Sequence, residues 1–286
     1  MHKVILFYKY TRIEDPAELV RAERARTTQL GFKGRMIVAH EGINGTYEGT
    51  PENISVYCRE LTADPRFSDI HFKVSDGDGK AFQKLSIKVR PEIVSSYLGE
   101  KDVHQTEKTG RHLKPDELKS WYEKGEEFTV IDMRNDYEFK SGHFKNSLAS
   151  GMENFRDLQK ITPRFAHLKT KKVLTVCTGG VRCEKASAYL LQQGFQDVYQ
   201  LDGGIVSYME KYPHQEFQGA LYVFDNRITM DTVSDPHEVI GVCERCSSAS
   251  ESYVNCANNF CHVHFILCGE CQKKDSLCND CTNKGL

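Results

Sequence analysis

The sequence predicts a chain of several domains, of mixed α/β and α+β class, because three patterns follow one another along it. Its 286 residues are too many for one average domain. Apolar runs of strand length alternate with helical segments through roughly the first two thirds of the chain. Eight of the eleven cysteines then lie between Cys243 and Cys281. We expect domains at residues 1–98, 114–218 and 219–286, with a linker at 99–113.

The first region has the strand and helix order of a split βαβ, ferredoxin-like domain. Its first helix has Asp15 as a cap and Pro16 at its first position, as helix N-termini favour. The expected strands are residues 4–9, 34–39, 45–49 and 70–75, and the expected helices are 16–30 and 51–62. A further strand at residues 85–90 alternates apolar with basic side chains, which usually indicates a half-solvated face.

Two polar features of this region are candidate binding elements. The turn His40-Glu41-Gly42-Ile43-Asn44-Gly45-Thr46 gathers a histidine, a carboxylate and an amide between two strands, as a substrate loop does. Five basic residues fit either a phosphate-contacting surface or an ordinary solvated strand face. They are Lys73, Lys80, Lys84, Lys88 and Arg90. The residues alone leave both interpretations of these lysines and arginine open.

The middle region is organised around a short loop that begins with Cys177 and ends with Arg182. An apolar, β-branched strand at residues 173–176 precedes it, and a helix at 184–191 follows it. Two glycines in the loop permit positive φ angles that turn successive N–H groups toward one point, which predicts an anion cradle. We expect the cradle to hold the thiolate of Cys177, because a helix N-terminus and a nearby cation both lower a thiol pKa. Arg182 is expected to close the loop around this anion, near the surface mouth of the site.

The three cysteines outside the terminal cluster have different expected roles. Cys177 is either a reactive thiol or an ordinary buried residue, and the glycines, arginine and helix start that follow it favour the reactive thiol. Cys183 falls at the first turn of the helix, where it either resolves a disulfide or persulfide on Cys177 or packs as a small buried residue. Cys58 lies alone in a helical segment and is interpreted as structural.

The loop resembles the active-site loop of a rhodanese domain. The matching residues are Cys177-Thr178-Gly179-Gly180-Val181-Arg182 followed by Cys183, then Val130-Ile131-Asp132-Met133-Arg134 upstream and Asp202-Gly203-Gly204 downstream. The resemblance covers about residues 113–212 and implies a reactive loop at the carboxyl end of a parallel strand. Related phosphatases have one more residue between cysteine and arginine, so this shorter loop favours sulfur chemistry. Asp132 and Arg134 are expected to form a structural ion pair that holds the neighbouring loops.

The last region predicts two metal sites built from four cysteine pairs. The pairs are Cys243/Cys246, Cys256/Cys261, Cys268/Cys271 and Cys278/Cys281. Thiols two residues apart wrap one tetrahedral ion, because the tight turn points both sulfurs the same way. We favour interleaved pairing, first with third and second with fourth, and two zinc ions; iron, or disulfides in place of metal, are the alternatives. His262 and His264 are expected to be packing or surface residues in a module with a structural role.

Net charge and the search for targeting segments bear on the partners and the cellular location of the protein. The formal net charge of −2 at pH 7 neither requires nor excludes a nucleic-acid partner. The apolar run at residues 4–8 is too short for the core of a signal peptide, and no stretch reaches the length of a membrane span. We therefore expect a cytoplasmic protein without a membrane partner, whose cysteines bind metal or react rather than form disulfides. The sequence predicts no particular oligomeric state.

Across nearly its full length the chain resembles the bacterial tRNA wobble-uridine hydroxylases. The turn at residues 40–46 and the segment 81–90 are similar to the N-terminal part of that family, in which a rhodanese domain follows. The resemblance implies oxygen-dependent conversion of uridine to 5-hydroxyuridine at the wobble position of the tRNA anticodon loop. It also implies molecular oxygen as co-substrate and an essential Cys177. No flavin fingerprint, haem-ligand pattern or two-His-one-carboxylate triad is apparent in the sequence, so no organic cofactor is expected.

Two other functions fit the same residues. The thiolate cradle suits a sulfurtransferase or persulfide carrier, because the terminal sulfur of a persulfide would lie among the loop N–H groups. The second alternative is a zinc-bearing adaptor for RNA or protein that does not catalyse a reaction.

Two mechanisms of hydroxylation are compatible with a reactive Cys177. Cys177 either forms a peroxidic or sulfenic species that delivers oxygen, or adds to C6 of uracil and makes C5 nucleophilic toward oxygen. We favour the addition to C6 for its chemical economy.

Overall fold

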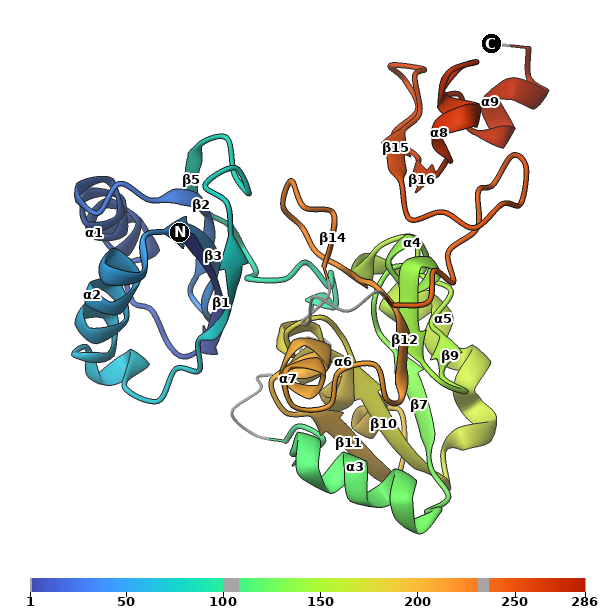
Figure 1. Ribbon diagram of the computed structural model, residues 1–286. Helices are drawn as coiled ribbons and strands as arrows, with labels where there is room; N and C mark the ends of the chain where they lie inside the picture. Colours follow the sequence, from blue (N-terminus) through green and yellow to red (C-terminus); the bar gives the residue numbers. More distant parts are fainter. Residues whose placement is uncertain (1, 100–107, 231–236, 286) are drawn as a thin grey trace.

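The computed structural model describes residues 2–99, 108–230 and 237–285. These residues form two sheet-based domains and a small cysteine-rich module (Figure 1). The mixed α/β and α+β class predicted from the sequence is confirmed. Residues 100–107 of the expected linker lie outside the described residues.

The first domain is a five-stranded sheet with the order β4-β1-β3-β2-β5. Four strands pair antiparallel in the ferredoxin-like arrangement, and β5 joins β2 in parallel as an added edge. Figure 1 shows α1 and α2 on the side of the sheet that faces away from the second domain, so the other face of the sheet is turned toward that domain. The elements are β1 (His2–Tyr10), α1 (Pro16–Gln29), β2 (Lys33–Ala39), β3 (Gly42–Gly49), α2 (Pro51–Thr62), the 3-10 helix η1 (Pro65–Phe67), β4 (Lys73–Gly77) and β5 (Leu85–Val89).

Two strands start at other positions than the sequence predicts. β3 begins at Gly42, three residues earlier, so that only His40 and Glu41 form the turn before it. Gly42 has a φ of +146°, and a Cβ at this position would lie 2.0 Å from the carbonyl oxygen of Lys9, so the close approach of β1 requires glycine. β4 begins three residues later than expected, at Lys73, because the chain before it is still in the turn that follows η1.

Aromatic side chains fill the space between this sheet and its two helices. Phe7, Phe32, Tyr47 and Tyr57 are buried, and their neighbouring ring centroids lie 5.5 to 5.8 Å apart. Each such ring contributes about 2–3 kcal/mol to folding through burial. The Tyr57 hydroxyl donates to the carboxylate of Glu23 at 2.8 Å, which satisfies a buried acid on α1. The sheet is thus a firm platform for the side chains on its other face.

The second domain is a parallel five-stranded sheet with the order β6-β11-β10-β7-β9. Helices connect its strands, as the alternating pattern in the sequence predicts. Its elements are β6 (Arg111–Leu113), α3 (Pro115–Lys124), β7 (Thr129–Asp132), α4 (Asp136–Ser141), β8 (Gly142–Phe144), β9 (Leu148–Ala149), η3 (Phe155–Asp157), α5 (Leu158–Ile161), η4 (Thr162–Leu168), β10 (Lys172–Val176), α6 (Val181–Gln192), β11 (Asp197–Leu201), α7 (Gly204–Lys211) and β12 (Phe217–Gly219).

Two elements of this domain differ from expectation. β6 lies inside the segment predicted as linker and pairs with β11 at the edge of the sheet. Its first two residues, Arg111 and His112, are polar and exposed, so it carries no apolar pattern. Helix α6 begins at Val181, three residues earlier than expected, because Gly180 takes a φ of +102° as its N-cap.

The cysteine-rich module packs against helix α4 of the second domain. The Tyr253 hydroxyl donates to the carbonyl oxygen of Tyr137, and Lys140 pairs with Glu244 at 2.7 Å. Figure 1 shows the module beside α4. The elements from residue 221 onward are β13 (Leu221–Tyr222), β14 (Thr229–Met230), β15 (Tyr253–Asn255), β16 (His264–Ile266), α8 (Gly269–Gln272) and α9 (Asn279–Asn283). No helix in the described parts of the chain is long and apolar enough to cross a bilayer.

Candidate active site

The loop from Cys177 to Arg182 wraps backbone N–H groups around a sulfur atom. It joins the carboxyl end of β10 to the first turn of α6. The Gly180 N–H donates to the Sγ of Cys177 at 3.2 Å, and the N–H groups of Arg182 and Cys183 donate to the same sulfur. The loop thus has the form of the predicted anion cradle, with the Cys177 sulfur at its centre.

The cradle makes Cys177 an acidic thiol. Burial by itself would raise its pKa. The hydrogen bond from the Cys183 thiol, the positive charge of Arg182 and the backbone N–H groups outweigh burial and lower the pKa of Cys177 to about 6. Burial and the neighbouring Cys177 raise the pKa of Cys183 well above its ordinary value. At neutral pH Cys177 is therefore a thiolate and Cys183 a thiol.

The glycine turn at residues 202–204 supports the loop from behind. The Ile205 N–H donates to the carbonyl oxygen of Cys177 at 2.9 Å, and the Val206 N–H donates to that of Thr178 at 3.1 Å. A Cβ on Gly204 would lie 2.7 Å from backbone atoms of the loop. The turn needs glycine because it carries the start of α7 directly onto the loop backbone.

Arg182 is buried and is not at a surface mouth, contrary to the sequence expectation. Its guanidinium donates to both carboxylate oxygens of Glu138 on α4, at 2.6 and 2.8 Å, and to the hydroxyl of Thr178 at 3.1 Å. Its side chain is 8% exposed and that of Glu138 is fully buried. The guanidinium therefore acts on the thiolate through its charge, while two of its N–H groups pair side by side with the two oxygens of Glu138. Only an arginine offers that fork of donors.

The expected ion pair of Asp132 and Arg134 is present. Arg134 donates to the Asp132 carboxylate at 2.9 and 2.7 Å, and both side chains are fully buried. Arg134 also donates to the carbonyl oxygen of Gly142 at 2.6 Å. The pair ties the end of β7 to the start of β8, which suits a supporting role.

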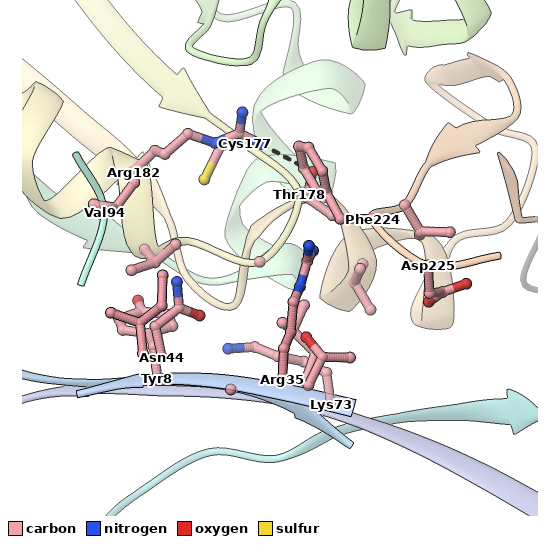
Figure 2. A pocket seen from close by; sticks show the side chains of 18 of the residues that line it. Tyr8, Arg35, Asn44, Lys73, Val94, Cys177, Thr178, Arg182, Phe224 and Asp225 are labelled. Atoms are coloured by element: carbon pink, nitrogen blue, oxygen red, sulfur yellow. Dashed lines mark hydrogen bonds between the residues drawn. The ribbon is translucent and has the colours of Figure 1, made fainter. Parts of the chain in front are cut away.

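A cavity of about 550 Å³ separates the loop from the sheet of the first domain. Cys177, Thr178 and Arg182 line its upper wall, and Tyr8, Arg35, Asn44 and Lys73 rise from the sheet opposite them (Figure 2). Neither domain forms this cavity alone. The side chain of Cys177 has no solvent-exposed surface, so its sulfur lies just beneath the cavity wall.

Lys73 places a buried cation on the sheet side of the cavity. It is 4% exposed, and its ammonium lies 4.8 Å from the centroid of the Tyr8 ring. No carboxylate of the described residues forms an ion pair with it. Burial lowers its pKa to about 8, against the opposing effect of the Cys177 thiolate. Lys73 lies buried on β4, at the opposite sheet edge from β5, whereas Lys80, Lys84, Lys88 and Arg90 are exposed in or next to β5, so the five basic residues predicted as one surface do not form one contiguous exposed patch.

Residues of the predicted turn 40–46 have two different roles: Glu41 contacts the second domain, and Asn44 lines the cavity. The carboxylates of Glu41 and Glu92 hold the fully buried ammonium of Lys185 on α6, at 3.0 and 2.8 Å. Asn44 lines the cavity and donates to the carbonyl oxygen of Ile93 at 3.0 Å. The first turn of α6 is thereby fixed to the first domain, with the Tyr8 hydroxyl 3.1 Å from a carboxylate oxygen of Glu184 as a further link.

The hairpin of β13 and β14 closes one side of the cavity. The ring of Phe224, 38% exposed, lies between two guanidinium groups, 5.5 Å from that of Arg35 and 5.6 Å from that of Arg182. Arg227 pairs with Asp225 and donates to the hydroxyl of Ser75 at 2.9 Å. This hairpin therefore bridges the two domains at the cavity, although its sequence predicts only an extended segment.

Two four-cysteine clusters form in the terminal module. The first contains Cys243, Cys246, Cys268 and Cys271, and the second Cys256, Cys261, Cys278 and Cys281; the sulfurs of each set lie within 4.8 Å of one another. The predicted interleaving of pairs is confirmed. The sulfurs of Cys246 and Cys268 lie 3.6 Å apart and those of Cys261 and Cys278 3.7 Å apart, close to the value of about 3.8 Å that a tetrahedral ion with bonds of about 2.3 Å requires. His264 instead packs on Tyr253 and hydrogen-bonds to Asn255, as a packing residue does.

Comparison with known proteins identifies the family. Models of three domains match the chain: a UPF0176 acylphosphatase-like domain at residues 2–93, a rhodanese-like domain at 114–211 and a rhodanese C-terminal domain at 218–284. A tRNA uridine(34) hydroxylase of Cytophaga hutchinsonii is 43% identical over 98% of this chain and 89% of its own length. One from Bacillus thuringiensis is 44% identical over 94% of this chain and 84% of its own. The chain belongs to the tRNA uridine(34) hydroxylase family.

A solved rhodanese-like domain from the Alr3790 protein of Anabaena is also similar, with 22% identity and a TM-score of 0.33. It covers 46% of this chain and 93% of that domain. Within the hydroxylase family fold, sequence reasoning placed Cys177 and the metal clusters but missed the role of the sheet opposite the loop. Tyr8 and Arg35 carry no motif, and only the fold brings them to the cavity.

For a member of the tRNA uridine(34) hydroxylases, the state of the thiol has a direct test. Because only the thiolate is alkylated, we expect the rate of Cys177 labelling by iodoacetamide to fall about tenfold per pH unit below its pKa of about 6 and to level off above it. Cys58, whose pKa burial raises to about 11, is the internal control and should still gain rate up to high pH. Peptide mapping by mass spectrometry separates the two sites. A Cys177 profile that still rises steeply between pH 7 and 9 would contradict the cradle.

Proposed function

We propose that this member of the tRNA uridine(34) hydroxylases converts uridine 34 of the tRNA anticodon loop to 5-hydroxyuridine in the interdomain cavity, with Cys177 as the reacting group. One observation carries the assignment: a thiolate held in a cradle of N–H groups lies directly under a cavity of nucleotide size. An enzyme that modifies a base must take it out of its stack and hold it in such a cavity.

The cavity groups suit a pyrimidine nucleotide. The Asn44 side chain lies in the wall, where an amide can pair with the N3–H and O4 edge of uracil. Arg35 also lines the cavity and is suited to a phosphate of the flanking nucleotides. The ring of Phe224 is 38% exposed in the cavity wall and offers an aromatic surface against which a neighbouring base can pack.

Addition of the Cys177 thiolate to C6 of uracil is the mechanism that we favour. The addition moves negative charge onto C5 and O4, and C5 becomes nucleophilic toward molecular oxygen. A cation opposite the sulfur stabilises that charge, and Lys73 is the buried cation there. In the alternative mechanism, Cys177 carries the oxygen as a peroxidic or sulfenic species.

Nucleoside analysis tests the proposed function. Purified protein with dithiothreitol and unmodified tRNA should form 5-hydroxyuridine in air and none under nitrogen, as measured by mass spectrometry of digested tRNA. The cradle also suits a persulfide, so thiosulfate:cyanide sulfur transfer is measured on the same protein. Rapid sulfur transfer with no hydroxylation would replace the proposal by a sulfurtransferase.

Replacing Lys73 by methionine is expected to lower kcat/KM for tRNA by about a hundredfold, because it removes the charge that faces the developing anion. Methionine keeps the length and the apolar stem, so the packing on Tyr8 is preserved. Lys124→Met at the exposed end of α3 removes the same charge away from the cavity and is the matched control, with an expected loss of less than about threefold. Equal losses for the two variants would show a general effect of net charge.

We propose zinc as the ion of both four-cysteine clusters, because all-sulfur tetrahedral sites suit it and a supporting module requires no redox role. Elemental analysis should find two zinc ions per chain, in colourless protein. A chelator should unfold the module, since metal binding and folding are coupled in such small domains. Brown protein with stoichiometric iron would contradict the assignment of zinc and indicate an iron–sulfur centre in the module.

The domain limits and cellular location complete the proposal. We place the ferredoxin-like domain at residues 1–98, the linker at 99–110, the rhodanese-like domain at 111–218 and the metal module at 219–286. The linker ends three residues earlier than the sequence predicts because β6 pairs with β11 in the second sheet. A cytoplasmic location fits a tRNA substrate and reduced cysteines. Fractionation of cells that express a tagged chain tests the location.

A further inference from the structure

Cys183 is a second buried thiol beside the reactive sulfur, and the mechanism above does not use it. It lies on the first turn of α6 and is fully buried. Its thiol hydrogen-bonds to the sulfur of Cys177, and the N–H of Gly180 donates to that same sulfur at 3.2 Å. The backbone N–H of Cys183 donates to the carbonyl oxygen of Gly180 at 2.9 Å, which fixes its place against the loop. The two sulfurs are therefore neighbours in a rigid part of the site.

The electron count of the reaction requires a reductant. Hydroxylation of C5 with molecular oxygen inserts one oxygen atom into the C5–H bond, and the other oxygen atom leaves as water. Forming that water consumes two electrons and two protons beyond those of the uracil. Two thiols that join in one disulfide release two electrons and two protons.

We propose that Cys177 and Cys183 form the redox pair of this site, supplying both electrons by closing a disulfide in each turnover. The inference rests on the proposed function and names its reductant. In balance, uridine, molecular oxygen and the two thiols become 5-hydroxyuridine, water and the disulfide between Cys177 and Cys183.

The bond changes of the proposed reaction follow one another in order. Oxygen adds at C5 of the Cys177 adduct as a hydroperoxide; the C5 proton is then lost and Cys177 leaves C6, which restores the C5–C6 double bond. A cysteine sulfur next attacks the terminal oxygen and the O–O bond breaks, which leaves 5-hydroxyuridine and a sulfenic acid. The other thiol attacks the sulfenic sulfur, its S–O bond breaks, and the oxygen departs as water.

The disulfide must be reduced before the next turnover. Cys177 borders the cavity, whereas Cys183 lies behind it in α6. An external dithiol that enters the cavity therefore attacks the sulfur of Cys177 and releases Cys183, by ordinary thiol–disulfide exchange. The cavity serves in turn as the route for the base and for the reductant.

A single-turnover experiment tests the pair without any substitution. Wild-type protein is reduced with dithiothreitol, freed of it under nitrogen and mixed with unmodified tRNA in buffer saturated with air. We expect 5-hydroxyuridine to stop at one per chain, with one disulfide between Cys177 and Cys183 for each 5-hydroxyuridine. Acid quenching, alkylation and peptide mapping measure the disulfide, and fresh dithiothreitol should restart turnover. Samples without tRNA or without oxygen should keep both thiols reduced.

Two variants distinguish the redox role of the Cys183 thiol from a general effect of a cysteine-to-serine change on folding. Cys183→Ser should form 5-hydroxyuridine without a disulfide and leave a sulfenic acid on Cys177 that dimedone traps. Cys58→Ser, which alters the cysteine of α2, should behave as wild type. Product formed by wild-type protein while both thiols remain free, or several turnovers without added dithiol, would overturn the redox pair alone. Failure to form 5-hydroxyuridine even with dithiothreitol and oxygen would overturn the proposed function and this inference together.

Discussion

Replacing Cys177 by serine is expected to reduce 5-hydroxyuridine formation by about ten-thousandfold, because a hydroxyl group is not ionised at neutral pH and cannot add to uracil as the thiolate does. Serine is close in size to cysteine and accepts hydrogen bonds from the same loop N–H groups. The variant should therefore fold, and it should still bind tRNA with nearly the affinity of the wild type. Single-turnover rates and a tRNA filter-binding assay measure the two properties separately.

The control for this experiment is Cys58→Ser, which removes the thiol of α2 outside the metal clusters. We expect its hydroxylation rate to stay within about twofold of wild type. In a deletion strain, complementation with Cys177→Ser should leave tRNA without 5-hydroxyuridine. Full hydroxylation by the serine variant would contradict the thiol mechanism. A normal cellular phenotype of the complemented strain, with no 5-hydroxyuridine in its tRNA, would favour an adaptor function.

The features that sequence reasoning predicts well are those that short motifs encode. The Cys177 loop, its strand and the Asp132–Arg134 pair depend on residues within a few positions of each other, or on adjacent parallel strands. The interleaving of the cysteine pairs also followed from a simple argument, because crossed pairs lock a small module better than pairs in series. Local pattern and local chemistry point the same way in these places.

The cavity could not be predicted in this way, because residues far apart in the chain build it. Lys73 is buried in the fold, but the sequence around it does not distinguish its strand from an ordinary solvated one. Phe224 follows a two-residue strand whose partner is another two-residue strand, too short for a periodic signal. The placement of Arg182 was wrong because its partner, Glu138, lies 44 positions away on α4. Nothing in the loop itself reveals that the arginine is already paired.

The pairing of Arg182 with Glu138 also connects the metal module to the chemistry. The module packs on α4 through Tyr253 and Glu244, and α4 carries Glu138 to the arginine of the loop. A shift of α4 would move the guanidinium that lowers the pKa of Cys177. Supporting the position of one carboxylate is thus a physical role for the two four-cysteine clusters, which lie outside the cavity.

Replacing Arg182 by alanine is expected to destabilise the second domain by about 3–5 kcal/mol, because the fully buried carboxylate of Glu138 would lose its only charged partner among the described residues. The same change should raise the pKa of Cys177, since the positive charge of Arg182 is one of the causes that lower it. Urea unfolding of the full chain measures the first effect, and the pH dependence of Cys177 alkylation measures the second. Arg12→Ala is the control, because Arg12 pairs with Glu14 on the surface and such pairs contribute about 0–1 kcal/mol.

A double variant separates stability from chemistry. Arg182→Met combined with Glu138→Leu removes both buried charges and fills the space with apolar side chains, which is often neutral or stabilising relative to the ion pair. We expect it to recover most of the stability that Arg182→Ala loses, while the pKa of Cys177 stays raised and hydroxylation at pH 7 stays low. Lysine at position 182 should rescue only in part, because a single ammonium cannot meet both oxygens of Glu138. Recovery of activity together with stability in the double variant would show that Arg182 supports the fold alone.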